Sequence, residues 1–478
     1  MSPDSPPHFD TITKREEGLQ RSLSAGQLSM IAIGGAIGTG LFLGSKFAIG
    51  FAGPAVLISY FIGALIALLL MGCLAEMTVA HPTSGSFGAW AEFYLSPLWG
   101  FLVRFAYWTG NAFALGTEVT AVAVYMHYWF PSTPGWYWIL AFSALLVFVN
   151  ALNVKLFGTV EYGFSAIKIG AIVAFLVLGA WVILAAGHHG SIGGGSSAIG
   201  FANYTAFGGF FPKGFGGMWT ALLVALFSYF SIEMIAVAAG EAADPQTAIE
   251  RAFRATLLRL VLFYLLTLAV ILAIVPWKVM ANGATQSPFV TVMLRTHIAG
   301  GAGVVNFVIL IAALSAMNSQ LYITTRMMFS LARAGFVPRR LGMLSRRGVP
   351  LSALMLSTVG VAVAAVLSVL YHDRAFFLML AISMFGPMFT WLMIFVTHLR
   401  FRRCHSYHEL AFHMWGYPYT TLLGAGLMLA ALATTIFKPD FRPTLFCGLP
   451  FLLILTIAYF LLRSRRSAAD LPAWKETP

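Results

Sequence analysis

The stretch Ile33-Gly34-Gly35-Ala36-Ile37-Gly38-Thr39-Gly40-Leu41-Phe42 decides the fold, because it places four glycines inside an apolar segment of membrane length. Glycine costs a helix roughly 1 kcal/mol per residue relative to alanine. In hydrocarbon, every backbone group that a broken helix frees must find another partner. A break here is useful where the freed amides and carbonyls line a cavity and hold a polar solute near the membrane midplane.

The composition is that of a polytopic membrane protein. The chain has 478 residues, of which 59% are hydrophobic and 10% charged, with a mean hydropathy of +0.83. Soluble domains carry about 25% charged residues. Apolar stretches long enough to cross a bilayer lie near 27–49, 53–79, 98–128, 136–155, 158–186, 215–240, 255–276, 302–333, 351–371, 375–399, 418–437 and 443–462. The sequence therefore predicts an all-α protein with roughly twelve transmembrane helices.

The net charge of +12 could indicate a nucleic-acid partner, but the basic residues follow membrane topology. When the loops are sorted by side, nineteen lysines and arginines fall on one side and seven on the other, while Arg104, Lys168 and Arg326 fall inside spans. Cytoplasmic loops carry such an excess. We therefore expect a multi-pass protein of the cell (inner or plasma) membrane, both termini in the cytoplasm, contact with membrane lipid, and no nucleic-acid partner. The sequence leaves the oligomeric state open.

No metal or cofactor site is predicted. The three cysteines lack the spacing of metal ligands: Cys73, Cys404 and Cys447. Three further histidines are expected in a polar cytoplasmic loop rather than a metal site: His405, His408 and His413. The first twenty residues contain no apolar core after basic residues, so we expect a disordered cytoplasmic tail and no cleaved signal peptide.

A second interruption follows five spans after the first. The sixth predicted span contains Phe227-Ser228-Tyr229-Phe230-Ser231-Ile232-Glu233, which places two serines and a glutamate at membrane depth. Two broken spans separated by an odd number indicate an inverted repeat with the site between its halves. The predicted organisation is a tail at 1–25, a transport core at 26–400 with repeats at about 26–186 and 215–400, two additional helices at 401–464, and a tail at 465–478.

The sequence also resembles the amino acid transporter (AAT) family of permeases in the amino acid–polyamine–organocation (APC) superfamily. The matching stretches occur in family order: IAIGGAIGTGLFLGS from Ile31, LAEMTVAHPTSGSF from Leu74, YW and TEVTA between Tyr107 and Ala121, NVKLFGTVEYGFSAIKI from Asn153, VAAGEAADPQTAIERA from Val237, NSQLY and TRMMFSLA from Asn318, and SRRGVP from Ser345. The resemblance implies a ten-helix LeuT-type core with two more helices, and amino acid uptake. One departure is Ser231-Ile232-Glu233, where family members commonly have Gly-Thr-Glu or Gly-Val-Glu.

The two breaks supply the predicted substrate site. The amides of Gly38, Thr39 and Gly40, at the positive end of the restarting helix, are expected to hold the substrate carboxylate. Carbonyls of the second break are expected to accept from the ammonium, and the resemblance suggests Phe227 as an aromatic gate. The alternatives are glycines that serve only close helix packing and a phenylalanine that is plain core. The predicted binding residues are Ala36, Ile37, Gly38, Thr39, Gly40, Phe227, Ser228, Tyr229 and Ser231.

Three ionisable residues deep in spans, Lys168, Glu118 and Glu233, are predicted to couple transport to protons. A charge at the bilayer centre costs at least about 2.5 kcal/mol, so it is functional by default. The resemblance implies that Lys168 replaces a sodium ion and bridges to carbonyls near Gly34 and Gly35. Its alternative role is a permanent structural tether. Either glutamate could carry the proton, because burial disfavours the charged form, and Glu233 could instead accept the freed amides of its own span.

Two further glutamates, Glu76 and Glu92, flank the loop HPTSGSFGAW on the cytoplasmic side. We expect them to pair with Arg104 or Arg326 and to shape the inner gate. The sequence contains no nucleophile–base pair or phosphate loop, so no enzyme is predicted.

The predicted function is a secondary active amino acid permease that imports by proton symport with alternating access. An exchanger using the same site is an alternative, as is a non-transporting membrane sensor. Which amino acid is transported, and which ionisable residue carries the proton, stay open at this point.

Overall fold

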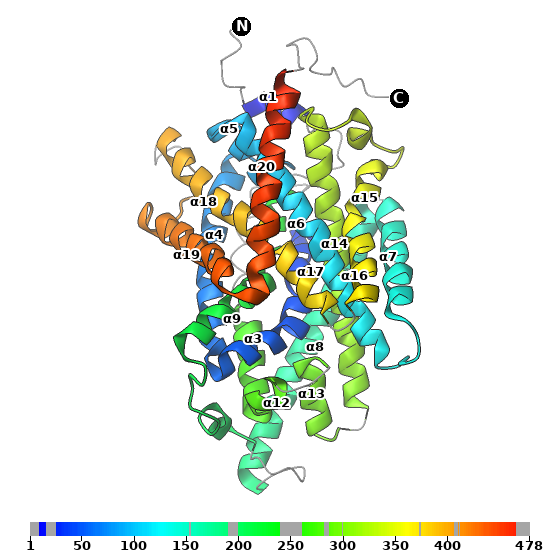
Figure 1. Cartoon of the computed structure of the whole chain (residues 1–478), viewed down its shortest axis with the longest axis vertical. Coiled ribbons are helices and arrows are strands. Elements are labelled where there is room, and N and C mark those ends of the chain that lie inside the picture. Colours follow the sequence, from blue (N-terminus) through cyan, green and yellow to red (C-terminus); the bar gives the residue numbers. More distant parts are fainter. Residues whose placement is uncertain are drawn as a thin grey trace.

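All secondary structure in the described part of the chain is helical, as predicted (Figure 1). The computed structural model describes residues 9–15, 25–152, 154–189, 199–239, 261–281, 286–298, 300–371, 374–405, 410 and 412–464. The predictions for His408, for residues 1–8 and 16–24 of the first tail and for the tail at 465–478 lie outside these residues.

The first half of the chain contains three short α-helices before the first long one, α4. Its elements are α1 (Phe9–Arg15), α2 (Ala25–Ala36), the π-helical turn η1 (Gly40–Gly44), α3 (Ser45–Ala52), α4 (Val56–Ala80), α5 (Ser86–Tyr94), α6 (Pro97–His127), α7 (Gly135–Leu152) and α8 (Val154–His189). Helix α6 illustrates how the sequence fixes a boundary: Ser96 accepts the amide of Trp99 (3.5 Å), and Pro97 occupies the first helical position.

The second half repeats the pattern of broken and continuous helices. Its elements are α9 (Gly214–Tyr229), α10 (Met234–Ala238), an apolar helix at Val261–Ile274, α12 (Trp277–Ala281), α13 (Pro288–Arg295), α14 (Gly301–Arg333), α15 (Leu351–Ser357), α16 (Val359–Leu370), α17 (Ala375–Ser383), α18 (Phe385–Cys404), α19 (Tyr419–Phe437) and α20 (Arg442–Ser464).

Membrane crossing is supported by helix length and hydropathy. Within the described residues, nine segments are long and apolar enough to span a bilayer, and one of them, Gly34–Ala80, contains both α3 and α4. Helix α6 has 31 residues but includes Arg104 and Glu118, so it is less apolar than its neighbours. The chain is a multi-pass membrane protein, and the count of twelve stays a prediction.

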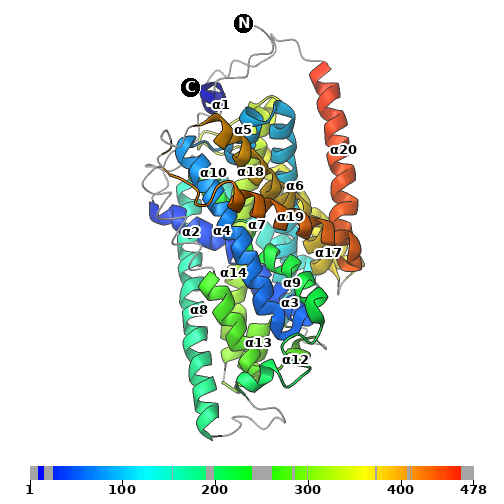
Figure 2. The same ribbon diagram turned by 90° about the vertical axis from the view of Figure 1, so that its left-hand side faces the viewer.

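Both predicted interruptions are present. The first helix breaks at Ile37 and Gly38, between α2 and the π-helical turn, and the later one breaks between Tyr229 and Met234. Helices α2 and α10 lie in one half of the molecule and α3 and α9 in the other, so the two broken helices run in opposite directions (Figure 2). The breaks therefore meet near mid-height.

The broken helices form the centre, and the last two helices lie outside. The most apolar window of the span Gly214–Ala238 is 100% buried, whereas only 33% of that window in α19 and 28% of that in the last span, which contains most of α20, is buried. Figure 2 shows α20 standing at the edge of the bundle. A site built on the breaks is thus enclosed by protein on every side.

The N-terminal segment differs from the prediction of disorder. Residues Phe9–Arg15 form helix α1, and Ile12 has an exposed fraction of 0%. The ring of Phe9 lies 4.3 Å from that of His81 and 5.5 Å from that of Phe93. Phe9 and Ile12 are three positions apart and share one helix face, so even this short polar segment can bury an apolar stripe.

Candidate substrate site between the two helix breaks

The first break frees backbone groups on both of its sides. Helix α2 ends at Ala36, whose carbonyl accepts the amide of Gly38 (3.1 Å) in a tight turn. The helix resumes at Thr39 and passes through the π-helical turn into α3. The carbonyls before the break and the amides after it then need partners from other helices.

Lys168 supplies the partner for the freed carbonyls. This lysine lies in α8, is 0% exposed, and donates from Nζ to the carbonyls of Gly34 (2.6 Å) and Ile37 (2.9 Å). The sequence predicted carbonyls near Gly34 and Gly35 as its partners, so Gly34 agrees and Ile37 takes the second place. The lysine thereby links the last turn of α2 to the first residue of the break.

Glu118 occupies the amide side of the same break. Its Oε2 atom accepts the main-chain N–H of Thr39 (3.1 Å), and the side chain is 3% exposed. A Cβ atom on Gly38 would lie 2.7 Å from Oε1 of Glu118, so glycine is required for this close approach. The Thr39 hydroxyl is buried and has no hydrogen-bond partner among the described residues.

The second break is held largely by one of its own residues. The carboxylate of Glu233 accepts from the amide of Ser231 (3.2 Å), the hydroxyl of Tyr107 (2.7 Å) and the indole N–H of Trp391 (2.9 Å). Glu233 is 0% exposed. Three neutral donors therefore satisfy this carboxylate, in agreement with the alternative that it stabilises the unwound segment.

The residue that departs from the common family pattern, Ser231, lies at a turn of the backbone. Its φ is 77°, in the left-handed region that glycine adopts without cost. The chain turns here just after α9 ends, where Phe230 donates its amide to the carbonyl of Leu226 (3.0 Å). Serine in place of glycine adds a hydroxyl next to the break and some backbone strain.

The two breaks touch each other. A Cβ on Gly40 would lie 2.7 Å from the Cα of Ser228, so these main chains pass in direct contact. The hydroxyl of Tyr264 lies within hydrogen-bond distance of the carbonyls of Ala36 (2.7 Å) and Ser228 (2.8 Å) and bridges both breaks. The glycines thus allow close helix packing and also leave backbone groups at the break. The two roles are compatible.

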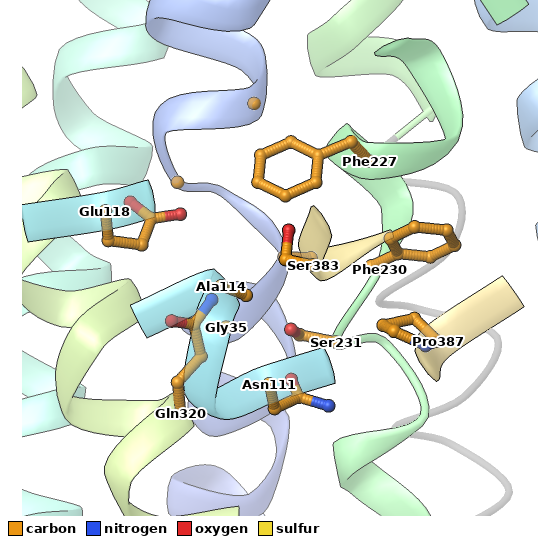
Figure 3. Close-up of a pocket in the computed structure, with 13 residues that line it drawn as sticks. Gly35, Asn111, Ala114, Glu118, Phe227, Phe230, Ser231, Gln320, Ser383 and Pro387 are labelled. Carbon is orange, nitrogen blue, oxygen red and sulfur yellow. The ribbon is translucent and has the colours of Figure 1, made fainter. Parts of the chain in front are cut away.

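A small cavity lies between the breaks (Figure 3). Its volume of about 20 Å³ for the centre of a water-sized sphere is room for roughly one or two waters. It must therefore widen to admit a larger solute. The lining residues are Gly35, Ala36, Gly38, Gly40, Asn111, Ala114, Glu118, Phe227, Phe230, Ser231, Gln320, Ser383 and Pro387.

The predicted residues divide between the cavity and its supports. Those that line it are Ala36, Gly38, Gly40, Glu118, Phe227 and Ser231, whereas Ile37, Thr39, Lys168, Ser228, Tyr229 and Glu233 do not. The hydroxyls of Ser228 and Tyr229 point to Tyr60 of α4, at 3.0 Å from its hydroxyl and 3.2 Å from its carbonyl. Their side chains therefore connect the second break to α4 and do not line the cavity.

Several residues were missed. Asn111, Gln320 and Ser383 line the cavity from α6, α14 and α17, and uncharged polar residues inside long apolar spans gave no distinctive signal. Glu161 of α8 is also fully buried, where Asn318 donates to it (3.0 Å) and Ser315 hydrogen-bonds to it.

A sequence signal for Glu161 did exist. It precedes Lys168 by seven residues, which is two helical turns and hence the same face of α8. Glu161 therefore belongs to the polar side of α8 that faces the first break and α14.

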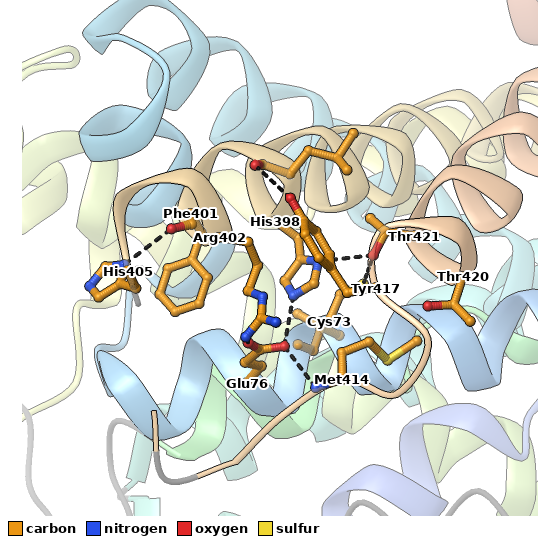
Figure 4. A network of polar contacts seen from close by, with 12 residues as sticks. Cys73, Glu76, His398, Phe401, Arg402, His405, Met414, Tyr417, Thr420 and Thr421 are labelled. Carbon is orange, nitrogen blue, oxygen red and sulfur yellow. Dashed lines mark hydrogen bonds and ion pairs between the residues drawn. The ribbon is translucent and has the colours of Figure 1, made fainter. Parts of the chain in front are cut away.

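A separate polar network lies outside the cavity and corrects the predicted pairing of Glu76 (Figure 4). Glu76 of α4 accepts from Arg402 (2.8 Å) and from the amide of Met414 (2.8 Å), and it shares a hydrogen bond with His398 (2.9 Å). Arg402 and His398 come from α18, so neither predicted arginine forms this pair. The predicted pairing of Glu92 with Arg104 is present at 2.7 Å.

Metal ligation finds no support in the described part of the chain. No group of three or more His, Cys, Asp or Glu side chains among these residues is placed to hold a metal ion.

Two opposed broken helices around a buried polar cavity are typical of membrane transporters. Comparison with known proteins gives the family. The family model described as "Amino acid permease" matches residues 27–471, and the chain belongs to this family. It is therefore a transporter and not an enzyme.

Three relatives from Bacillus subtilis (strain 168) align over nearly their whole length. "Uncharacterized amino acid permease YtnA" is 35% identical over 94% of this chain and 96% of its own. "Amino-acid permease RocE" is 35% identical over 96% and 98%, and "Amino-acid permease RocC" is 37% identical over 92% and 94%.

Proposed function

We propose that the protein imports amino acids across the cell membrane by proton symport with alternating access. The family supplies the amino acid class of substrate. The proton as driving ion is supported by one observation above the others: the carboxylate of Glu118 lies on the Thr39 amide at the first break (3.1 Å) and also lines the cavity.

This contact gives a physical reason for coupling. The amides after the break are the natural binding place for a substrate carboxylate. While Glu118 is ionised, a second carboxylate there would bring two negative charges within a few ångströms in a low-dielectric site, which is unfavourable. Protonation of Glu118 removes one of the charges. Substrate and proton then bind together, and each is released more easily once the other has left.

Lys168 and Glu233 have different places in this scheme. Lys168 donates to the carbonyls of Gly34 and Ile37, so it stands where a bound cation would otherwise neutralise those dipoles. Glu233 accepts three neutral donors and lies outside the cavity. We assign the transported proton to Glu118, a fixed bridging role to Lys168, and a structural role to Glu233.

The direction and site of transport belong to the same proposal. Helix α1 and the C-terminal end of α20 lie at one end of the bundle (Figure 1), and the basic residues concentrate on the side assigned to the termini. By the positive-inside rule this end faces the cytoplasm. An inward proton gradient then drives accumulation inside the cell.

The test uses the full chain in proteoliposomes with an equimolar mixture of the twenty ¹⁴C-labelled L-amino acids. An inside-alkaline pH gradient should drive accumulation above equilibrium, and a proton ionophore should abolish it. Uptake that ignores the pH gradient and requires preloaded amino acid would instead establish an exchanger. Absence of any uptake above protein-free liposomes would reject transport altogether.

Glu118→Gln is the matched variant. A permanently neutral side chain should retain exchange of labelled for unlabelled amino acid but lose gradient-driven accumulation, because no proton moves with the substrate. Accumulation at the wild-type level in Glu118→Gln would remove Glu118 from the coupling scheme.

A further inference from the structure

The direction of the hydrogen bonds inside the cavity can be read from the partners of its side chains. Asn111 donates one of its two Nδ2 protons to the carbonyl of Tyr107 (3.0 Å), and its Oδ1 atom stays available as an acceptor. Ser383 donates its only hydroxyl proton to the carbonyl of Leu380 (2.8 Å), so its oxygen can only accept from a solute. Both residues therefore offer acceptors to the cavity.

Gln320 adds a third polar group. Its side chain is 4% exposed, and its Oε1 atom is buried without a hydrogen-bond partner among the described residues. A buried acceptor without a partner costs about 1–3 kcal/mol. A solute that reaches this oxygen as the cavity widens would supply the missing donor.

The ionisable groups of the cavity point to the same class of solute. Among the described residues that line it, Glu118 is the single ionisable one, and none is a lysine, arginine or histidine. A side-chain carboxylate placed there would meet acceptors and an acid, with no cation to balance it. Glu233 is already satisfied by three donors and does not reach the cavity.

The geometry separates a backbone end from a side-chain end of the site. Figure 3 shows Asn111 and Gln320 at the end of the cavity away from Phe227, with Ser231 and Ser383 between. The charged groups common to all amino acids belong at the helix breaks. The variable side chain would then extend towards α6, α14 and α17.

We propose that Asn111, Gln320 and Ser383 form a specificity subsite that selects amino acids whose side chains donate hydrogen bonds and carry no negative charge. Carboxamide, imidazole, guanidinium and ammonium side chains meet this requirement. Aliphatic and acidic side chains do not. The inference rests on the proposed amino acid transport and adds the class of side chain.

The test measures initial uptake of six labelled amino acids separately in proteoliposomes. Glutamine, histidine and arginine represent donors, norleucine and leucine represent aliphatic side chains of similar size, and glutamate is the acidic partner of glutamine. The fastest substrate should be a donor, ahead of leucine, norleucine and glutamate by roughly tenfold or more, since one unmade hydrogen bond to a buried acceptor has this effect.

The outcomes distinguish a wrong specificity subsite from a protein that does not transport amino acids. If leucine, norleucine or glutamate is the fastest substrate, the specificity subsite is wrong while amino acid transport stands. If neither the six amino acids nor the full labelled mixture is taken up, both transport and the subsite are overturned.

Gln320→Leu tests the subsite directly. Removal of the acceptor should lower the ratio of the fastest donor's uptake to norleucine uptake by roughly tenfold, mainly through faster norleucine uptake. Gln286→Leu is the matched control, because Oε1 of Gln286 is also buried without a partner among the described residues, but Gln286 lies outside the cavity lining. Ser383→Ala provides a second variant with the same expected direction if Gln320→Leu folds poorly. An unchanged ratio in a folded variant contradicts the proposal.

Discussion

The two helix breaks are similar in place but differ in what holds them. The first is held by ionisable side chains from other helices: Lys168 of α8 lies on its carbonyls, and Glu118 of α6 lies on its amide side. The second is held by Glu233 from the break itself, which receives three neutral donors.

The difference indicates a division of work within the proposed cycle. Partners that belong to separate helices and change charge can transmit protonation into helix movement, because the contact couples two bodies. Glu233 receives neutral donors from α6, α18 and its own turn and, among the described residues, hydrogen-bonds to no charged partner, so it stabilises one shape of the backbone. We therefore expect the first break to change shape when Glu118 is protonated. The second break, called the fixed frame below, is expected to keep its shape.

The largest effect is expected for Lys168→Ala. The variant leaves the carbonyls of Gly34 and Ile37 without their donor, and two unsatisfied buried acceptors cost about 2–6 kcal/mol together. Gradient-driven accumulation should fall to the level of protein-free liposomes, and the thermal midpoint in detergent should drop. Lys213→Ala, at an exposed lysine outside the breaks, is the control. Wild-type accumulation in Lys168→Ala would mean that the first break does not depend on this tether.

A smaller and purely structural effect is expected for Glu233→Gln. The amide nitrogen of glutamine cannot accept, so at least one of the donors from Tyr107, Trp391 or Ser231 loses its partner, at about 1–3 kcal/mol. The thermal midpoint should fall, while the pH profile of uptake keeps the wild-type shape. A shifted profile in this variant, with none in Glu118→Gln, would exchange the roles assigned to the two breaks.

The contact between the breaks can be tested by Gly40→Ala. The added methyl group would lie 2.7 Å from the Cα of Ser228, which is main chain and cannot rotate away. Overpacking of this kind costs about 1–3 kcal/mol, so stability and maximal uptake should both decrease. Gly170→Ala is the matched control, because nothing lies within 4 Å of the Cβ position at Gly170. Equal behaviour of the two variants would show that the breaks separate freely.

The smallest effect is expected for Ser231→Gly. Glycine adopts the φ of 77° without strain, so stability should stay unchanged or rise by up to about 1 kcal/mol. Initial uptake should stay within about twofold of wild type if the second break is a fixed frame. Ser231→Ala, which removes the hydroxyl and keeps the strain, is the comparison. A large loss of uptake in Ser231→Gly alone would show that the strained turn itself takes part in transport.

Much of the fold and part of the site could be predicted because the relevant signals are local. Glycines inside a membrane-length apolar run marked the first break, and two serines with a glutamate marked the second. A lysine in the middle of a span is costly enough in hydrocarbon to require a partner, and its contact with Gly34 followed from the resemblance. The boundaries of the repeats stay a prediction.

The rest of the site could not be predicted because its residues leave no local mark. Asn111 and Gln320 are uncharged and sit in long helices, and Tyr264 is one of many aromatic residues in apolar spans. The pairing of Glu76 with Arg402 joins positions 326 residues apart. Charge pairs of this kind depend on which helix ends lie side by side.

The sequence alone determined that this protein lies in a membrane, which helices break, and that Lys168, Glu118 and Glu233 must be buried, because each polar group exposed to hydrocarbon carries its own energetic cost. Only the tertiary structure decided which groups meet: Glu118 on the Thr39 amide, Tyr264 across both breaks, and Asn111 with Gln320 in the cavity. Those contacts follow from the packing of helices far apart in the chain, and no local sequence pattern indicates which helix faces meet.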